Sequence, residues 1–188
     1  MISKLKTQII IAGIGGQGVL FASKVFSELG LKLGLDVLGS ETHGMSQRGG
    51  SVVAHLKLGG FYSSLVRTGA ADILYSFTED EAYRNMKFLK DKGVCFVNLK
   101  DPKRFDPAIL SHLKKKGIVF KPFDAVEAAL RIGFARSANI VLIGYSVGSG
   151  LVPFAYDDVR SVLESVSRKK DREMNLKAFE SGFEKATV

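Results

Sequence analysis

The hydrophobic positions of the first 40 residues follow a strand pattern and then a helix pattern. Residues 8–12 form a run of mostly β-branched side chains, which is typical of a strand buried on both faces of a parallel sheet. After a glycine-rich segment, apolar residues recur at helical spacing over 19–29 and predict an amphipathic helix that ends near Gly30 or Gly34. A second short strand is expected at 36–39. This order predicts the opening of a doubly wound α/β fold.

Over residues 51–58 the pattern changes, and successive side chains alternate between the two faces of a predicted strand. With Gly59-Gly60 as a turn and a returning strand over 61–66, this segment predicts a β-hairpin. The α/β pattern then resumes, with strands expected at 73–77, 94–98 and 118–120 and helices at 79–90, 106–116 and 125–130.

The last third of the chain is predicted to be helical. Ser137 is expected to cap a helix through residues 140–143, and Asp157 to cap a second helix. Apolar positions between Met174 and Phe183 predict a terminal helix packed on the core. We expect the glycines at 144, 148 and 150 to allow close helix packing. The predicted fold is therefore α/β, a Rossmann-like, doubly wound, mostly parallel sheet with an inserted β-hairpin and a helical C-terminal region, in a single domain spanning 1–188.

Composition narrows the class of protein. A chain of 188 residues has the size of one ordinary domain. Its single cysteine, Cys95, cannot form an internal disulfide, which favours a reducing, cytoplasmic location. One cysteine also cannot hold an iron–sulfur cluster, which is ligated by several thiolates. No segment approaches the roughly 20 apolar residues of a membrane span, so no membrane association is expected.

The formal net charge of +8 leaves two interpretations open. Basic runs at 114–116 and 168–170 would attract an acidic partner, a phosphorylated cofactor or a nucleic acid. Alternatively, they are solvated helix ends, where lysines complement the helix dipole. No aromatic residues are interleaved with the basic runs, so binding to nucleic acid is not expected.

The first glycine-rich segment has the spacing of a dinucleotide-binding loop. Gly13, Gly15 and Gly18 fit the pattern G-x-G-x-x-G between a strand and a helix, where free amides suit an anionic phosphate. Glu41 follows at about the distance expected of a ribose-binding acid. The alternative is a tight strand-to-helix turn that binds no ligand.

A second polar segment, residues 41–50, precedes the alternating strand. It is too polar for a core and too rich in glycine for a helix, and such loops often carry function on a rigid scaffold. Arg48 offers a planar fork for a carboxylate or phosphate. His43 titrates near neutral pH, although a lone histidine is more often structural.

Together these two segments resemble the γ-type subunit of 2-oxoacid:ferredoxin oxidoreductases. The segments are Gly-Ile-Gly-Gly-Gln-Gly at 13–18 and Glu-Thr-His-Gly-Met-Ser-Gln-Arg-Gly-Gly-Ser-Val at 41–52. The second resembles the β subunit of the indolepyruvate type in particular. Residues 77–81 depart from the family pattern, which has an acidic residue and a proline-like turn there. Further matches are Asp72, Glu81, Arg84, Asn98, Asn139, Asn175, Phe179 and Gly182.

The resemblance implies a subunit that works only within a complex. Such enzymes oxidatively decarboxylate a 2-oxoacid on thiamine diphosphate, pass electrons through iron–sulfur clusters to ferredoxin and release an acyl-CoA. Because this chain lacks a G-D-G thiamine motif, thiamine diphosphate and the clusters are expected on a larger partner subunit. The chain alone is expected to bind none of these cofactors, to show no activity and to self-associate. Within the complex it would help to shape a cleft for the substrate or CoA.

Neither a catalytic residue nor a metal ligand is assigned from the sequence. An alternative function is a stand-alone NAD(P)-binding protein that uses the first loop and Glu41, and a third is a scaffold without a ligand. The residues expected to bind a cofactor or form the subunit interface are Gly13, Gly15, Gly16, Gln17, Gly18, Glu41, Thr42, His43, Gln47, Arg48, Gly49 and Gly50.

Overall fold

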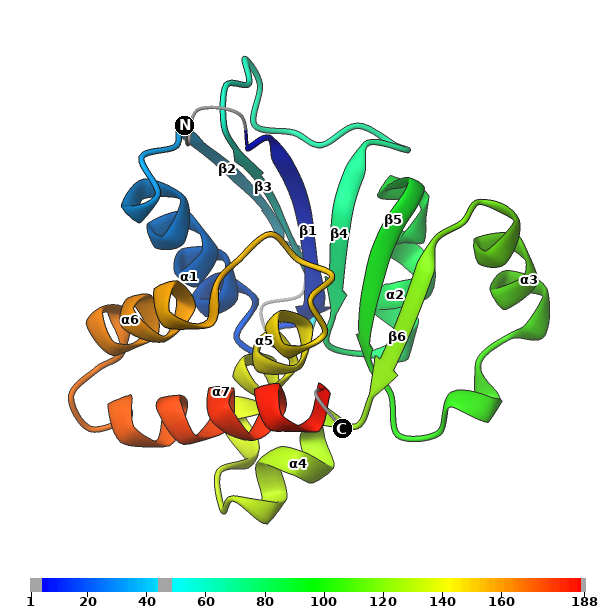
Figure 1. The fold of residues 1–188 in the computed structure, drawn as a ribbon. Coiled ribbons are helices and arrows are strands. Elements are labelled where there is room, and N and C mark those ends of the chain that lie inside the picture. Colours follow the sequence, from blue (N-terminus) through cyan, green and yellow to red (C-terminus); the bar gives the residue numbers. More distant parts are fainter. Residues whose placement is uncertain (1–4, 44–48, 187–188) are drawn as a thin grey trace.

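The computed structural model describes residues 5–43 and 49–186, with the backbone alone for His43. This part of the chain forms a six-stranded sheet in the order β2-β3-β1-β4-β5-β6 (Figure 1). Strands β1, β4, β5 and β6 run parallel, whereas β3 lies antiparallel between β1 and β2. The expected mostly parallel α/β sheet is confirmed. The strands are β1 (Thr7–Ile14), β2 (Val37–His43), β3 (Ser51–Leu58), β4 (Ala71–Ser76), β5 (Leu89–Asn98) and β6 (Val119–Phe123).

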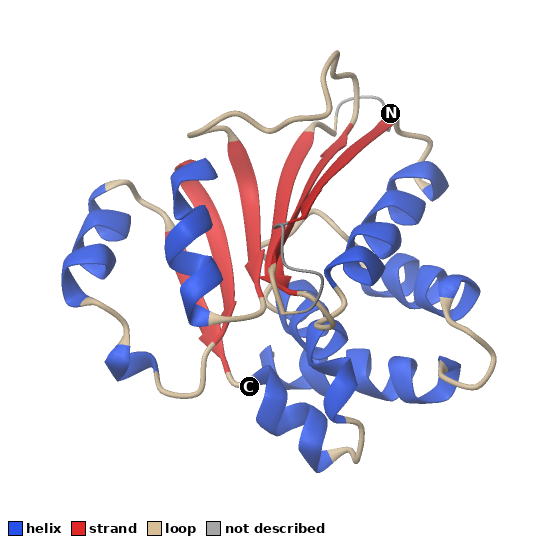
Figure 2. Cartoon of the chain, turned by 180° about the vertical axis from the view of Figure 1, so that it is seen from behind, coloured by secondary structure: helices blue, strands red, loops and turns tan. Residues whose placement is uncertain are grey.

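Helices cover both faces of the sheet (Figures 1 and 2). One core lies between the sheet and α1, α5, α6 and α7, and the other lies between the sheet and α2 and α3. None of the helices in the described ranges is both long and apolar enough to cross a membrane. The helices are α1 (Val19–Lys32), α2 (Glu79–Asn85), α3 (Pro107–Lys115), α4 (Ala125–Arg131), α5 (Ala138–Gly148), α6 (Tyr156–Val166) and α7 (Arg172–Ala186), with short 3₁₀ turns η1 (Met86–Phe88), η2 (Pro102–Arg104) and η3 (Ala135–Ser137).

Strand β1 is buried on both faces, as its apolar run predicts. Ile9 and Ile11 belong to the first core, and Ile10 and Ala12 belong to the second. The following helix α1 ends two residues before Gly34, whose φ of 71° lies in the left-handed region that a side chain disfavours. The sequence therefore correctly predicts strand β1 and the end of helix α1 near Gly34.

The predicted hairpin partner of β3 is wrong. Residues 61–66 form no strand, and β3 pairs instead with β1 on one side and with β2 on the other. The Gly59 amide donates to the carbonyl of Asp36 at 2.8 Å, and the chain then leaves the sheet as a loop. The Phe61 ring contacts the ammonium groups of Lys6 and Lys57, at 5.5 and 5.2 Å from its centroid, and forms no strand ladder. The antiparallel partners of β3 are therefore β1 and β2, which both precede it in the chain.

Three element boundaries also differ from the expectations. Strand β2 extends to His43, because β3 supplies a ladder partner as far as Val52, so Glu41 and Thr42 lie within a strand. Helix α2 ends at Asn85 rather than near residue 90, because β5 already begins at Leu89. Strand β5 begins at Leu89 rather than at residue 94, and it shifts its register against β4 where Lys92 has a φ of 63°.

Neither of the two helix N-caps expected in the last third of the chain is formed as predicted. Ser137 precedes α5, but its hydroxyl donates to the carbonyl of Phe134 at 2.7 Å instead of capping the helix. Ala155 precedes α6, and Asp157 lies within its first turn, where a carboxylate still favours the helix dipole. The expected close helix packing is confirmed for Gly144 and Gly148 of α5, which lie directly against the backbone of α7. It is wrong for Gly150, which follows the helix and has no described residue within 4 Å of a Cβ position.

Candidate functional site

The carboxyl ends of the parallel strands meet at one edge of the sheet, and a hollow of about 150 Å³ opens there. Ligands of open α/β sheets bind at this edge. The walls come from the loops after β1 and β4, from the end of β5, from α4 and η3, and from the start of α5. The lining residues are Gly16, Gln17, Phe77, Asn98, Val126, Ala135, Arg136, Ala138 and Asn139.

The glycine loop between β1 and α1 is held by its own hydrogen bonds. The Gln17 side chain accepts from the Ile14 amide at 2.8 Å, and the Gln17 amide donates to the Ile14 carbonyl at 3.0 Å. Gly16 and Gly18 have φ values of 98° and 80°, a region that side chains disfavour. Nothing in the described chain lies within 4 Å of the position of a Cβ on Gly16. The loop is therefore preformed and open toward the hollow.

The two glycine-rich segments predicted from the sequence meet in space. The Gly15 amide donates to the Gly50 carbonyl at 2.9 Å. The next residue, Ser51, donates from its hydroxyl to Oε2 of Glu81 at 2.7 Å. Glu81 is fully buried and also accepts from the side chains of Arg84 and Asn85. A buried carboxylate on α2 thus anchors the end of the second segment beside the glycine loop.

A larger hollow of about 470 Å³ adjoins the first and shares Gly16, Arg136 and Asn139 with it. Together these two hollows are called the cleft below. Arg168, Lys170 and Asp171 also line it, so the charged wall carries three cations and one acid. Among the described residues, none of the three cations forms an ion pair. The N-terminus of α1 adds its own positive end, so the cleft suits an anion.

The two basic runs therefore have different surroundings. Lys114 and Lys115 end α3, and Lys116 pairs with Asp91 at 3.6 Å, as expected of a solvated helix end. The run at 168–170, in contrast, contributes to the cleft. Sequence reasoning did not single out Arg136, and its position in the sequence carries no motif that would have identified it.

Asn139 connects α5 to the glycine loop. Its Nδ2 donates to the Gly18 carbonyl at 3.1 Å. A Cβ on Gly18 would collide with the Asn139 amide, so this position requires glycine. Oδ1 of Asn139 is buried and receives no hydrogen bond from any described residue.

The remaining predicted residues have mixed outcomes. The side chains of Glu41 and Thr42 are exposed on the edge strand β2, and β3 separates them from β1 and its loop. Adjacent strands lie about 4.8 Å apart, so Glu41 is not beside the loop as a dinucleotide site requires. Gln47, Arg48 and the side chain of His43 lie outside the described residues.

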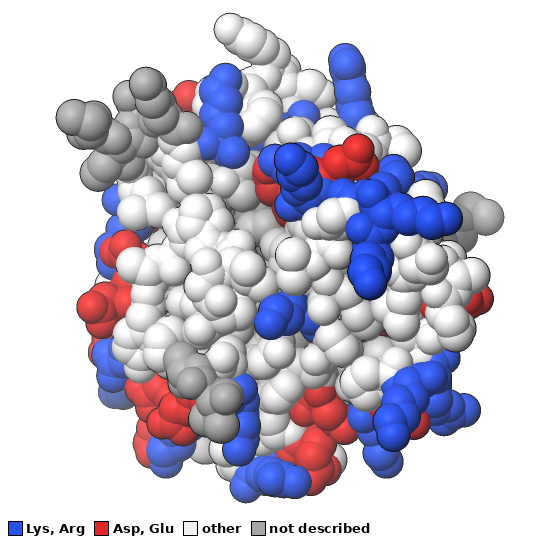
Figure 3. All heavy atoms as spheres, turned by 45° about the vertical axis from the view of Figure 1, so that its right-hand side comes forward, with Lys and Arg blue, Asp and Glu red and all other residues white. Residues whose placement is uncertain are grey.

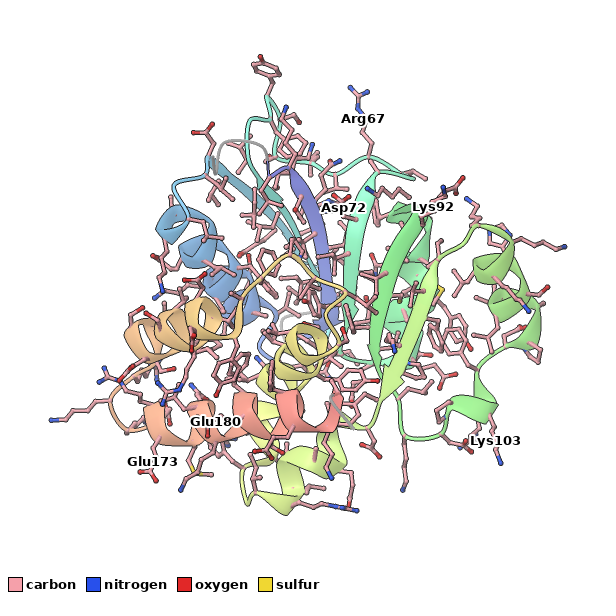
Figure 4. All side chains as sticks on the ribbon, viewed as in Figure 1. Arg67, Asp72, Lys92, Lys103, Glu173 and Glu180 are labelled. Atoms are coloured by element: carbon pink, nitrogen blue, oxygen red, sulfur yellow. The ribbon has the colours of Figure 1, made fainter. Side chains whose placement is uncertain are left out.

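Polar side chains at the opposite end of the sheet form a separate group. Figure 4 shows Asp72 and Lys92 at the amino ends of β4 and β5, far from α7. Lys and Arg side chains gather near the top of the face shown in Figure 3, with acidic side chains between them. Asp72 accepts from the Gln8 amide at 2.7 Å and pairs with Lys90. These contacts stabilise the fold and do not reach the cleft.

The single thiol is structural. Cys95 is fully buried in β5, and burial raises the pKa of its thiol far above the ordinary range. A neutral, inaccessible thiol neither attacks a substrate nor ligates a metal.

The fold and cleft define a Rossmann-like α/β protein with a preformed glycine loop beside a basic cleft. The chain belongs to the pyruvate ferredoxin/flavodoxin oxidoreductase family, whose model matches residues 8–185. It is 34% identical to the indolepyruvate oxidoreductase subunit IorB of Thermococcus kodakarensis, over 95% of each chain. The expected family is thereby confirmed.

Two solved structures have the same fold. The γ subunit of keto/oxoacid ferredoxin oxidoreductase from Geobacter sulfurreducens is 26% identical, with a TM-score of 0.75 over 96% of this chain and 98% of that one. The 2-oxoglutarate:ferredoxin oxidoreductase from Magnetococcus marinus, with 2-oxoglutarate, coenzyme A and succinyl-CoA bound, is 19% identical, with a TM-score of 0.75. This chain matches 31% of that one, and at this identity the likeness shows the fold alone.

Proposed function

We propose that this chain is a subunit of an indolepyruvate-type 2-oxoacid:ferredoxin oxidoreductase that works only with a larger companion subunit. The family match and the similarity to an IorB subunit along nearly the whole chain support this class of enzyme. The proposal places thiamine diphosphate and the iron–sulfur clusters on the companion, because this chain has no G-D-G motif and its one cysteine is buried. Its residues do not fit either cofactor.

The cleft carries the second part of the proposal, that this chain binds the anionic end of CoA. Three cations, a preformed glycine loop and the positive end of α1 converge on one cleft. Phosphate groups bind readily to such helix N-termini. The chain's part in the reaction is then to hold and orient CoA against the companion, which carries the chemistry of the 2-oxoacid.

Neither alternative function gains support from the geometry. β3 lies between Glu41 and the glycine loop, which removes the ribose contact of a dinucleotide site. A scaffold without a ligand predicts a loop closed by side chains, whereas no described residue lies within 4 Å of a Cβ on Gly16. Contacts of His43, Gln47 and Arg48 with the companion, transfer to ferredoxin and a cytoplasmic location remain predictions.

The test is a reconstitution. Indolepyruvate- and CoA-dependent reduction of an artificial electron acceptor is measured with the chain alone, the companion alone and both together. We expect turnover only with both, because the chain lacks an electron sink of its own. Turnover by the chain alone contradicts its assignment as a dependent subunit.

The CoA part is tested in the same assay with the double variant Arg168→Gln/Lys170→Gln. We expect the KM for CoA to rise about tenfold or more, since each lost charge-assisted contact costs about 1.5–3 kcal/mol when formed directly, while the KM for indolepyruvate stays constant. Lys115→Gln/Lys116→Gln, in the other basic run, is the matched control. Equal effects of both pairs would show that only the net charge matters.

A further inference from the structure

The orientation of the Asn139 amide follows from its contact with the glycine loop. The Gly18 carbonyl can only accept, so the side-chain nitrogen of Asn139 must face it, at 3.1 Å. The side-chain oxygen then points away from Gly18. This assignment is set by the backbone of the loop.

That oxygen is the one buried side-chain nitrogen or oxygen atom of the described residues without a hydrogen-bond partner. Asn139 is 5% exposed and lines both hollows of the cleft. Native proteins leave few buried acceptors unpaired, and each exception needs an explanation, such as strain, a bound water or ion, or a functional role. The acceptor therefore calls for a donor that enters the cleft.

The position of this acceptor restricts the ligand. Gly18 precedes the first turn of α1, a helix of 14 residues whose N-terminal amides suit a phosphate. Arg136, which lines both hollows with Asn139, supplies a cation beside it. With a phosphate bound at the N-terminus of α1, the group that can donate to Oδ1 of Asn139 is one next to that phosphate on the same ligand.

We infer that Asn139 is the residue by which the cleft selects a ribose phosphate, with its Oδ1 accepting a hydrogen bond from the hydroxyl adjacent to the phosphate. This inference rests on the proposed function, since it concerns the same cleft. In CoA the matching group is the ribose 2′-hydroxyl beside the 3′-phosphate. A deoxyribose phosphate has the same charge but lacks this donor, so the cleft discriminates against it.

The experiment compares adenosine 3′-monophosphate with 2′-deoxyadenosine 3′-monophosphate. Both are titrated into the full chain while the backbone amide signals of Gly16 and Gly18 are followed by NMR. The wild-type chain is expected to bind the ribose form about fivefold more tightly, as one net hydrogen bond allows. Asn139→Ala is expected to bring this ratio close to unity.

Two further variants separate selection from loop support. Asn139→Asp keeps the acceptor, so the preference for the ribose form should return even where overall affinity is lower. Arg136→Gln is expected to weaken both ligands equally and to leave the ratio unchanged. A purely structural role of Asn139 changes both affinities together.

Two results overturn the role of Asn139 alone. In one, the ratio of ribose to deoxyribose affinity is the same in the wild type and Asn139→Ala. In the other, the wild type shows no preference for the ribose form. If the wild type binds neither ligand at the glycine loop, the anion-binding cleft itself is wrong, and this inference falls with it. The two failures are therefore distinguishable.

Discussion

His55 is a buried histidine whose neutral form the fold requires. It is 6% exposed on β3, and its Nδ1 accepts a hydrogen bond from the Val66 amide at 3.2 Å. The ring edge packs on Phe88 with 5.2 Å between centroids. Burial, followed by the nearby charge of Lys57, lowers the pKa of His55. Protonation would break the bond to Val66, because a protonated imidazole only donates.

This shift gives a pH dependence of defined sign. Between the lowered pKa and about 6.5, the unfolded chain binds a proton that the folded chain does not. The free energy of unfolding should therefore fall as the pH drops below about 6.5 and stay level above it. We expect His55→Asn, which keeps an acceptor near Nδ1 but cannot titrate, to reduce this loss. Urea unfolding at several pH values measures the loss of unfolding free energy. His112→Asn is the control, because His112 is exposed.

Helices α5 and α7 pack through glycines rather than through interlocking side chains. A Cβ on Gly182 would lie 2.8 Å from the carbonyl carbon of Val141 and 2.9 Å from the Tyr145 nitrogen. Gly144 and Gly148 face the backbone of α7 in the same way. The two helix backbones therefore lie in direct contact, and α5 in turn holds Asn139 at the cleft.

Gly182→Ala is expected to destabilise the fold by about 1–3 kcal/mol, the usual cost of overpacking, in spite of the higher helix propensity of alanine. The midpoint of urea unfolding reports the change. Ser181→Ala in the same helix is the matched control and should be neutral or slightly stabilising. Equal stability of Gly182→Ala and the wild type would mean that the two helices can separate at little cost.

At the scale of elements, local patterns could be read from the sequence and pairings between distant segments could not. The glycine loop and α1 were predictable because strand, turn and helix signals follow one another directly. The partner of β3 was not, because residues 61–66 carry a similar apolar pattern to a strand. The cleft depends on Asn139 meeting Gly18 across 121 positions, and neither residue marks that contact in the sequence.

At the scale of the whole molecule, the glycine loop borders two unlike surfaces. They are the basic cleft and a mostly apolar hollow of about 400 Å³, which shares Gly16, Gly18 and Phe21 with the cleft. Leu20, on the first turn of α1, is 45% exposed there. An apolar surface beside a ligand cleft suits a permanent subunit interface. The apolar hollow is lined by Ile14, Gly15, Gly16, Gly18, Val19, Leu20, Phe21 and Val52.

We expect Leu20→Lys to weaken assembly with the companion subunit by about 1–3 kcal/mol, because it places a charge in an apolar contact. Analytical ultracentrifugation of the mixed subunits measures this. Leu31→Lys is the matched control, since Leu31 is 58% exposed near the other end of the same helix. Both variants should fold alike. Equal loss of assembly, or none, would place the interface elsewhere.

Strand β1 is synthesised before the other described strands but lies between β3 and β4, which are both made later. Until residue 58 has emerged, both edges of this apolar strand lack their partners, and one edge stays open until residue 76. Unpaired apolar edges are templates for aggregation. The order of synthesis therefore makes the nascent chain depend on protection of its first strand, and a product truncated before β4 would retain the hazard.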